Sequence, residues 1–216
     1  MLEVGCGTGK ATVGFATLDL TIVALDPGPA MIAEARTNVG DRPGIRFVHS
    51  TFEDWSPDAG PFDLIAAAQA WHWVPPSVGY LKAADLLVPG GVLAILGNDW
   101  HPRVDGFRNA IDEVYLRLAP ELRDSPMGVW YRPEGPLPQL MDGSGLFAER
   151  GYRRFDWSRR MTLESYLAML VTLSNHQGLE PDRLRSLVQG LEAAARPFGD
   201  TVDIDYTTHL HYSRRL

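Results

Sequence analysis

An apolar, strand-like run breaks into a glycine-rich loop within the first nine residues of this 216-residue chain, Met-Leu-Glu-Val-Gly-Cys-Gly-Thr-Gly. Glycine is needed where the backbone takes positive φ or where a ligand must approach it closely. The successive N–H groups of such a loop form a concave site for polar groups. Residues 10–18 then predict a helix, whose N-terminus adds unpaired N–H groups and positive partial charge. We call residues 5–9 the glycine loop and expect it to bind the polar part of a nucleotide-like cofactor.

The spacing within the glycine loop distinguishes between cofactor classes. A dinucleotide-binding loop has the pattern G-x-G-x-x-G, but Lys10 stands where that pattern needs its last glycine. An NAD-dependent oxidoreductase is therefore disfavoured and stays open as a third interpretation. Asp26 ends the next apolar run, residues 21–25, and an acid at the carboxyl end of a buried strand can bind the hydroxyls of a ribose. The alternative is a turn or N-cap aspartate before Pro27.

Composition and charge restrict the class of function. With 45% hydrophobic residues, the chain suits one α/β domain with a modest insertion. A formal charge of -7 opposes binding to nucleic acid or to an anionic membrane, so a small-molecule substrate is favoured. Cys6 is the only cysteine, which excludes an intrachain disulfide and fits a reducing cytoplasm. We expect a cytoplasmic monomer or homodimer.

Strand and helix patterns alternate along the first half of the chain, with glycine or proline between them. This alternation predicts right-handed βαβ units and a mostly parallel sheet. The pattern loosens over residues 98–145, whose proline and glycine content predicts a cap over the site. Apart from the first strand and helix, the predicted strands are 21–25, 45–49, 62–68, 92–97, 147–157 and 207–212, and the helices are 29–38, 77–87, 107–118, 163–173 and 181–195.

An aromatic cluster, Gln-Ala-Trp-His-Trp-Val at residues 69–74, follows the fourth predicted strand. Ligands of open α/β sheets bind beyond the carboxyl ends of the strands, so this cluster should face the reacting group. His72 is a candidate catalytic base or hydrogen-bond partner of the substrate, and a packed structural histidine is the alternative. Trp71 and Trp73 are candidate substrate-binding walls. The remaining candidates for the substrate pocket, each with a structural alternative, are His101, Trp130 and Tyr131.

The sequence also contains a histidine pair and three arginine pairs, for which a structural or surface role is favoured over a binding role. His209 and His211 alternate on one face of the last predicted strand, as two metal ligands do. No third ligand is convincingly spaced, so we predict no metal site. Arginine pairs at 153–154, 159–160 and 214–215 could attract an acidic substrate, although isolated pairs are usually solvated surface.

Taken together, the motifs resemble those of class I S-adenosylmethionine (SAM)-dependent methyltransferases. The glycine loop with Glu3 two residues before it resembles their first motif. Residues 69–74 and the Leu-Val-Pro-Gly-Gly turn at 87–91 are similar to the small-molecule "type 11" group, which includes trans-aconitate methyltransferase-like members. The resemblance implies a Rossmann-like α/β fold with a mostly parallel seven-stranded sheet, order 3-2-1-4-5-7-6, and helices on both faces. It implies a single methyltransferase domain over residues 1–216, with 98–145 as a small cap insertion.

The same resemblance implies roles for individual residues. The glycine loop would cradle the methionine part of SAM, with Glu3 reaching its ammonium group. Asp26 would bind the ribose, and Met31 with residues 52–53 would frame the adenine, with Asp54 as a competing acceptor. The implied cofactor-binding residues are Glu3, Gly5, Cys6, Gly7, Gly9, Asp26, Pro27, Met31, Phe52, Glu53, Ala68 and Gln69.

The sequence thus predicts a SAM-dependent methyltransferase that acts on a small molecule. Oxygen is the preferred acceptor atom, in a carboxylate or a hydroxyl, while nitrogen and carbon stay open. The alternative is a non-catalytic SAM or S-adenosylhomocysteine (SAH) binder, or a truncated, degenerate methyltransferase. This alternative arises because Met1 lies inside the first predicted strand, where similar proteins carry a preceding helix that closes over the cofactor. A start codon placed too late, or a truncated gene product, would explain the difference.

Overall fold

One seven-stranded sheet, in the order β3-β2-β1-β4-β5-β7-β6, is formed within the described part of the chain. The computed structural model describes residues 1–57, 60–123 and 127–216. The predicted strand order is confirmed. The strand bounds are β1 Leu2–Val4, β2 Ile22–Asp26, β3 Ile45–His49, β4 Phe62–Ala68, β5 Leu87–Pro102, β6 Phe147–Thr162 and β7 Thr201–Arg215.

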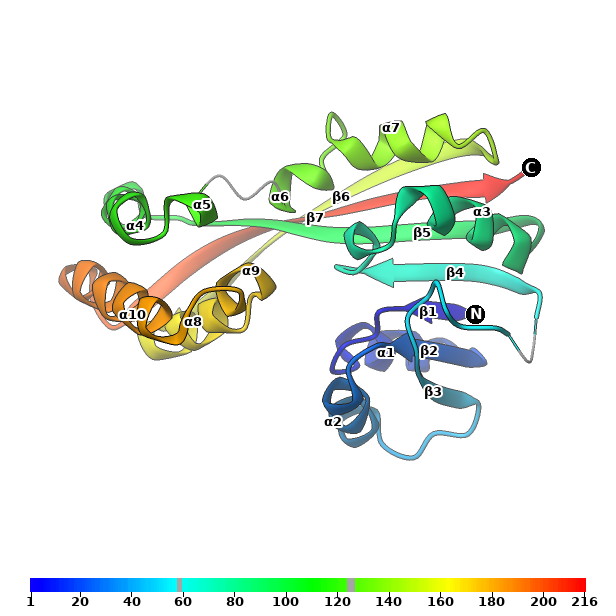
Figure 1. The fold of residues 1–216 in the computed structure, drawn as a ribbon, viewed down its shortest axis with the longest axis horizontal. Coiled ribbons are helices and arrows are strands. Elements are labelled where there is room, and N and C mark those ends of the chain that lie inside the picture. Colours follow the sequence, from blue (N-terminus) through cyan, green and yellow to red (C-terminus); the bar gives the residue numbers. More distant parts are fainter. Residues whose placement is uncertain (58–59, 124–126) are drawn as a thin grey trace. The chain divides into compact units, whose positions relative to one another are not determined.

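The short strand β1 lies at the centre of the parallel part of the sheet. It pairs in parallel with β2 on one side, where Leu2 lies opposite Val23, and with β4 on the other, where Leu2 lies opposite Ile65. The pairs β2–β3 and β4–β5 are also parallel. The arrow of β7 points opposite to that of β4 (Figure 1), so β7 runs antiparallel to β4. The carboxyl ends of β1, β2 and β4 therefore lie at one edge, where the glycine loop begins.

Helices connect most of the strands. Several begin with proline in the first turn, where the missing N–H costs no hydrogen bond. Their bounds are α1 Lys10–Phe15, α2 Pro29–Val39, α3 Pro76–Leu86, α4 Asp105–Leu118, α5 Pro120–Arg123, α6 Met127–Trp130, α7 Pro136–Gly143, α8 Leu163–Val171, α9 Ser174–Gln177 and α10 Pro181–Ala195. Short 3₁₀ helices are η1 Ala16–Leu18, η2 Trp71–Trp73 and η3 Arg196–Phe198.

The chain divides into two compact units. The first consists of Met1–Asn98, Val129–Arg154 and Thr208–Leu216, and the second of Asp99–Gly128 and Phe155–Thr207. The predicted cap, residues 98–145, is thus shared between the units. The interpretation of the chain as one methyltransferase domain with this cap stays a prediction.

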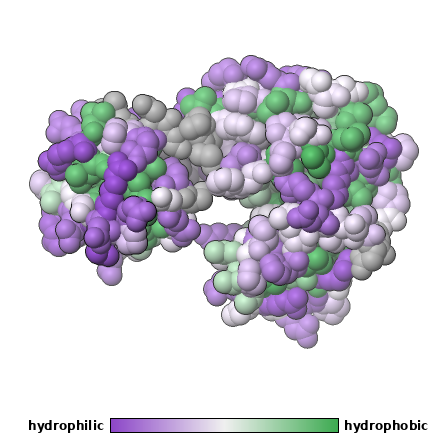
Figure 2. All heavy atoms as spheres, viewed as in Figure 1, coloured by the Kyte–Doolittle hydropathy of each residue, from purple (hydrophilic) through white to green (hydrophobic). Residues whose placement is uncertain are grey.

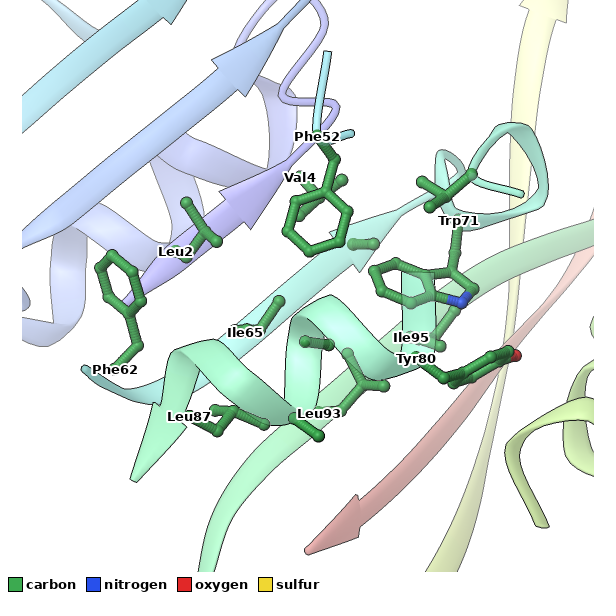
Figure 3. Packing of buried hydrophobic residues seen from close by; sticks show 14 of the residues in the cluster. Leu2, Val4, Phe52, Phe62, Ile65, Trp71, Tyr80, Leu87, Leu93 and Ile95 are labelled. Atoms are coloured by element: carbon green, nitrogen blue, oxygen red, sulfur yellow. The ribbon is translucent and has the colours of Figure 1, made fainter. Parts of the chain in front are cut away.

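The sheet of the first unit buries both of its faces. On β2, Val23 belongs to the core cluster that also contains Tyr80 and Ala83 of α3. The next residue, Ala24, belongs to a separate cluster with Ile32 of α2. Successive strand residues point to opposite faces, so helices cover both sides of the sheet, as predicted. Figure 3 shows the larger cluster, in which aromatic and aliphatic side chains of the strands meet α3.

The core of the second unit is formed by α4, α8 and α10 together with apolar residues of β7. Val202 and Ile204 are buried, while the side chains between them carry charge. Asp203 pairs with Arg160 at 2.7 Å and Asp205 with Arg103 at 2.6 Å. Residues 203–205 thus lie on a strand whose polar face carries these ion pairs.

The last three strands extend beyond their predicted bounds. β5 covers Leu87–Pro102 instead of residues 92–97, and β7 covers Thr201–Arg215 instead of 207–212. Polar residues interrupt the apolar runs, so hydrophobicity alone marks only the middle of each strand. On β7 buried and half-buried residues alternate over most of its length, because one face of the strand packs on a core.

Hydrophilic and hydrophobic residues are interspersed on the face of the molecule that Figure 2 shows. Exposed large apolar side chains come from separate elements, for example Leu18 of η1, Trp73 of η2 and Leu116 of α4. Scattered residues of this kind are ordinary on a folded protein. Among the helices in the described ranges, none combines the length and the apolar character needed to cross a membrane.

Gly97 of β5 provides a test of the packing in the first unit. A Cβ atom at this position would overlap the ring of Tyr131, which is fully buried, whereas a Cβ on Gly143 of α7 would meet nothing within 4 Å. We expect Gly97→Ala to lower the free energy of unfolding by about 1–3 kcal/mol, because overpacking must displace the ring. Urea denaturation measures the change. Gly143→Ala is the matched control, and equal stability of the two variants would contradict the prediction.

Candidate cofactor and acceptor site

The glycine loop has the geometry that its sequence predicts. Gly5, Gly7 and Gly9 all have positive φ, of 70°, 55° and 81°. A Cβ on Gly5 would overlap Ala70, and one on Gly9 would lie 3.2 Å from Ala35 of α2. At Gly7 no atom of the described residues lies within 4 Å of the Cβ position, so this part of the loop borders open space. The outer glycines are therefore required by packing, and the middle one leaves room for a ligand.

The Asp26 carboxylate connects the glycine loop to the loop after β2. Its Oδ2 accepts a hydrogen bond from the Gly7 N–H at 2.8 Å, and its Oδ1 accepts one from the Gly28 N–H at 2.8 Å. The residue is buried, with 8% of its surface exposed. Since a carboxylate can accept about four hydrogen bonds, acceptor capacity remains for a ligand. The predicted contact of Asp26 and Pro27 with a ribose stays a prediction.

Glu3 is buried beneath the glycine loop. One carboxyl oxygen, Oε2, accepts a hydrogen bond from Thr12 Oγ1 at 2.7 Å. The other, Oε1, is buried without a hydrogen-bond partner among the described residues. Burial raises the pKa of Glu3 to about 7, opposed by the hydrogen bond from Thr12. A cationic ligand would favour the charged carboxylate, so this orphaned oxygen fits the predicted role toward the ammonium of SAM.

Cys6 supports the site through its backbone N–H and not through a reactive thiol. Its N–H donates to the Leu25 carbonyl at 2.8 Å, which attaches the glycine loop to β2. Burial, with smaller contributions from Glu3 and Asp26, raises the pKa of the thiol to about 12. A neutral thiol is a poor nucleophile, so a redox or nucleophilic role is disfavoured.

The predicted adenine-binding residues lie on two segments. Met31 of α2 is 44% exposed, whereas Phe52 is buried and packs against Trp71 with ring centroids 5.6 Å apart. Lys82 of α3 was not predicted: its Nζ donates to the Glu53 carbonyl at 2.7 Å and to the Trp55 carbonyl at 2.6 Å. Lys82 therefore holds the segment that carries the predicted adenine contacts. Its rarity, as one of the two lysines of the chain, was the only sequence signal for it.

At the end of β4 the backbone turns sharply. Gln69 has a φ of 57°, and its N–H donates to the Leu96 carbonyl at 2.8 Å. Ala68 is half-buried and the Gln69 side chain is exposed, which leaves both available for the predicted contact beside the sulfonium. The two tryptophans that follow differ. Trp71 is 1% exposed between Phe52 and Tyr80 (Figure 3) and is a core residue, while Trp73 is 64% exposed.

His72 and Tyr131 form a hydrogen-bonded pair. His72 Nδ1 and the Tyr131 hydroxyl oxygen are 2.6 Å apart, and the rings of Trp73 and Trp130 lie with centroids 5.0 and 6.0 Å from that of His72. His72 Nε2 is buried and has no hydrogen-bond partner among the described residues. Burial lowers the pKa of His72 to about 4, so the imidazole is neutral near pH 7.

The remaining histidines occupy different places. His101 is exposed on the part of β5 that belongs to the second unit. His209 Nδ1 lies 2.9 Å from the Tyr152 hydroxyl, and His211 Nε2 donates to the Tyr131 carbonyl at 2.8 Å. Across the residues that the structure describes, no three side chains are grouped to hold a metal ion.

One family model covers the part of the chain that contains the glycine loop, Asp26 and the segments after β3 and β4. Residues 1–91 match the family model described as a methyltransferase domain. This segment is similar to methyltransferase domains. An uncharacterized methyltransferase of Mycobacterium tuberculosis is 33% identical over 124 residues, 57% of this chain and 49% of that protein. The chain thus spans about half the length of this relative, 49%.

A further sequence match aligns fewer residues, whereas two solved structures match nearly the whole chain in fold. A trans-aconitate 2-methyltransferase of Methylobacterium radiotolerans is 35% identical over 97 residues, 44% of this chain and 36% of that protein. A protein assigned as a type II methyltransferase from Anaeromyxobacter dehalogenans has a TM-score of 0.67 and 22% identity, covering 99% of this chain and 88% of its own. Phosphoethanolamine N-methyltransferase 2 of Haemonchus contortus, solved with S-adenosyl-L-methionine, has a TM-score of 0.55 and 13% identity, covering 100% of this chain and 48% of its own. The fold is the class I methyltransferase fold.

Glu3 makes the stability of the chain dependent on pH. Its pKa is about 7 in the folded chain against 4.5 ordinarily, so the folded state keeps a proton that the unfolded state has lost between these values. Stability from this group is therefore lost as the pH rises through that window. At pH 4 we take the difference in free energy of unfolding between Glu3→Gln and the unmodified chain as the reference. We expect this difference to change by about 3 kcal/mol in favour of Glu3→Gln by pH 8, because only the unmodified chain loses stability through Glu3. Urea denaturation at several pH values measures this, with the exposed Glu34→Gln as control. Parallel stability curves for Glu3→Gln and the unmodified chain would contradict it.

Lys82 should limit the motion of residues 52–55. Lys82→Met keeps the apolar stem and removes the donor to both carbonyls. We expect backbone amides of this segment to exchange with deuterium about tenfold faster, because a hydrogen bond from a charged group contributes about 1.5–3 kcal/mol. Mass spectrometry of the corresponding peptide gives the rate. Lys10→Met, at an exposed lysine of α1, should leave it unchanged. If the segment exchanges equally in both variants, Lys82 does not hold it.

Proposed function

We propose that this chain transfers a methyl group from SAM to an oxygen of a small-molecule acceptor, a carboxylate or a hydroxyl. The observation that carries the proposal is the pair of hydrogen bonds from Gly7 and Gly28 to Asp26, within the segment similar to methyltransferase domains. They hold together the two loops that would bind the methionine and ribose parts of the cofactor.

The residues of the first unit are compatible with SAM. No described atom lies within 4 Å of the Cβ position of Gly7, so the loop leaves room beside it for the methionine end of the cofactor. Glu3 has an oxygen without a hydrogen-bond partner in the described ranges, and this oxygen suits an ammonium group. When bound, SAM supplies a methyl group on a sulfonium, which is a very good leaving group. The protein then has mainly to align the acceptor, and alignment alone can contribute about 7–11 kcal/mol to lowering the barrier.

The choice of oxygen as acceptor atom rests on two supports. The relative from Methylobacterium radiotolerans is named for methylation of trans-aconitate, a carboxylic acid. In addition, a carboxylate can accept a methyl group without a catalytic base, and the one histidine beside the carboxyl end of β4 has a pKa lowered to about 4 by burial. A group with so low a pKa is a weak base for removing a hydroxyl proton near pH 7.

Calorimetric titration with SAM and SAH tests cofactor binding. We expect the chain to bind both, and we expect Asp26→Ala to weaken binding at least about tenfold, because the loops lose their shared acceptor and the ribose loses its partner. Asp85→Ala, at an exposed acid of α3, is the control and should bind as the unmodified chain does. Urea denaturation of both variants separates loss of binding from loss of folding.

Methyl transfer itself is then assayed with trans-aconitate as a carboxylate probe and catechol as a hydroxyl probe. Formation of a methyl ester or ether supports the proposal. Binding of SAM without transfer to either class of oxygen would favour a non-catalytic binder. Absence of SAM and SAH binding by a folded chain would refute the proposal.

A further inference from the structure

The proton positions around the Tyr131 hydroxyl determine the tautomer of His72. Tyr131 has no exposed surface, and burial raises the pKa of its hydroxyl, so the group keeps its proton. The backbone N–H of His72 also interacts with this oxygen. A backbone N–H can only donate, so it cannot receive the hydroxyl proton.

Among the described residues, His72 Nδ1 is the hydrogen-bond partner found for the Tyr131 hydroxyl, at 2.6 Å. If Nδ1 carried a proton and donated it, the hydroxyl proton and the Nε2 lone pair would both be buried without a partner among the described residues, whereas a proton on Nε2 leaves only the Nε2–H without one. Leaving a buried donor unpaired costs about 1–3 kcal/mol. Nδ1 is therefore the acceptor, and the neutral imidazole carries its proton on Nε2.

We infer that His72 is a hydrogen-bond donor through Nε2–H to an acceptor oxygen that is already anionic, and that Tyr131 is the positioning residue that sets this tautomer. The inference rests on the proposed function, because it assigns a role at the acceptor side of the same site. Nε2 is buried and unpartnered among the described residues, so a ligand oxygen would supply the partner that this donor lacks.

The proton balance of the reaction limits which acceptors fit a donor. Methylation of a carboxylate forms an O–CH₃ bond, breaks the S–CH₃ bond of SAM and yields a methyl ester and SAH, with no proton released. Methylation of a neutral hydroxyl must also release its proton to a base. Nε2 has no free lone pair in the Nε2–H tautomer, so it cannot take that proton. The donor instead binds the negative charge of a carboxylate.

The surroundings of His72 favour this assignment. Trp73 and Trp130 pack on its ring, and Tyr131 approaches it edge-on with an interplanar angle of 88°. In the surroundings that the structure describes, aromatic rings lie on several sides, which strengthens a hydrogen bond to an anion by excluding water. The lowered pKa, about 4, keeps the imidazole neutral and its Nε2–H in place at physiological pH.

Nitrogen-15 NMR of the histidine rings tests the tautomer without an acceptor or a turnover. We expect the His72 signals to show a protonated Nε2 and a hydrogen-bonded, unprotonated Nδ1 at pH 7, and His72→Gln identifies these signals by their loss. Tyr131→Phe should move the Nδ1 signal, because the hydroxyl donor is gone. Tyr152→Phe removes a comparable hydroxyl beside His209 and should leave the His72 signals unchanged. A protonated Nδ1, or an Nδ1 signal that ignores Tyr131→Phe, would overturn the inference.

A second pair of variants keeps the test independent of Tyr131. Glutamine places an N–H near the position of Nε2, and asparagine places one near Nδ1. With trans-aconitate as the probe, we expect His72→Gln to keep most of kcat/KM and His72→Asn to lose about ten- to a hundredfold. Equal losses in both variants would contradict a donor at Nε2. Failure of SAM binding would overturn the proposed function instead, while the NMR result would still decide the tautomer.

Discussion

The hydrogen bonds that Asp26 accepts are the interaction on which the candidate site depends. One carboxylate binds the N–H groups of Gly7 and Gly28, which follow two neighbouring parallel strands. Each N–H would otherwise be an unpaired donor in a loop with irregular backbone. Because the two bonds use both oxygens, they set the distance between the loops as well as their orientation. A cofactor that spans the carboxyl ends of β1 and β2 then meets a site that is already formed.

Burial favours the uncharged form of three groups near the candidate site. It raises the pKa values of Glu3 and Cys6 and lowers that of His72. In each case burial stabilises the neutral form relative to the charged form. The site therefore has few permanent charges of its own and many fixed hydrogen-bond donors and acceptors. Such a site suits ligands that bring charge with them, as SAM and a carboxylate do. Preorganised donors cost no reorganisation when charge arrives.

The sequence was most informative where local geometry and function coincide. The glycine loop and the parallel pairing of β1 to β5 follow from residue spacing, because positive φ and buried apolar runs are local properties. The strand order was implied by the family resemblance. The sequence was least informative for the long strands β5, β6 and β7, because polar residues interrupt their apolar runs. Some of these polar residues form ion pairs, as Arg160 of β6 does with Asp203 of β7. The roles of Trp71 and Lys82 also required the structure. A tryptophan next to a site can belong to the hydrophobic core or line the substrate pocket, and a lysine can be solvated or can hydrogen-bond to a neighbouring segment.

By itself, the sequence determined a methyltransferase-type glycine loop, an acid after the second strand and an aromatic cluster after the fourth, since backbone freedom and hydrophobic periodicity are written in consecutive residues. Only the tertiary structure decided which groups these elements bring together. The approach of Tyr131 to His72 joins residues 59 positions apart, and its hydroxyl selects the imidazole tautomer. Contacts of this kind depend on how strands and helices pack, and packing is a property of the whole fold that no single stretch of sequence contains.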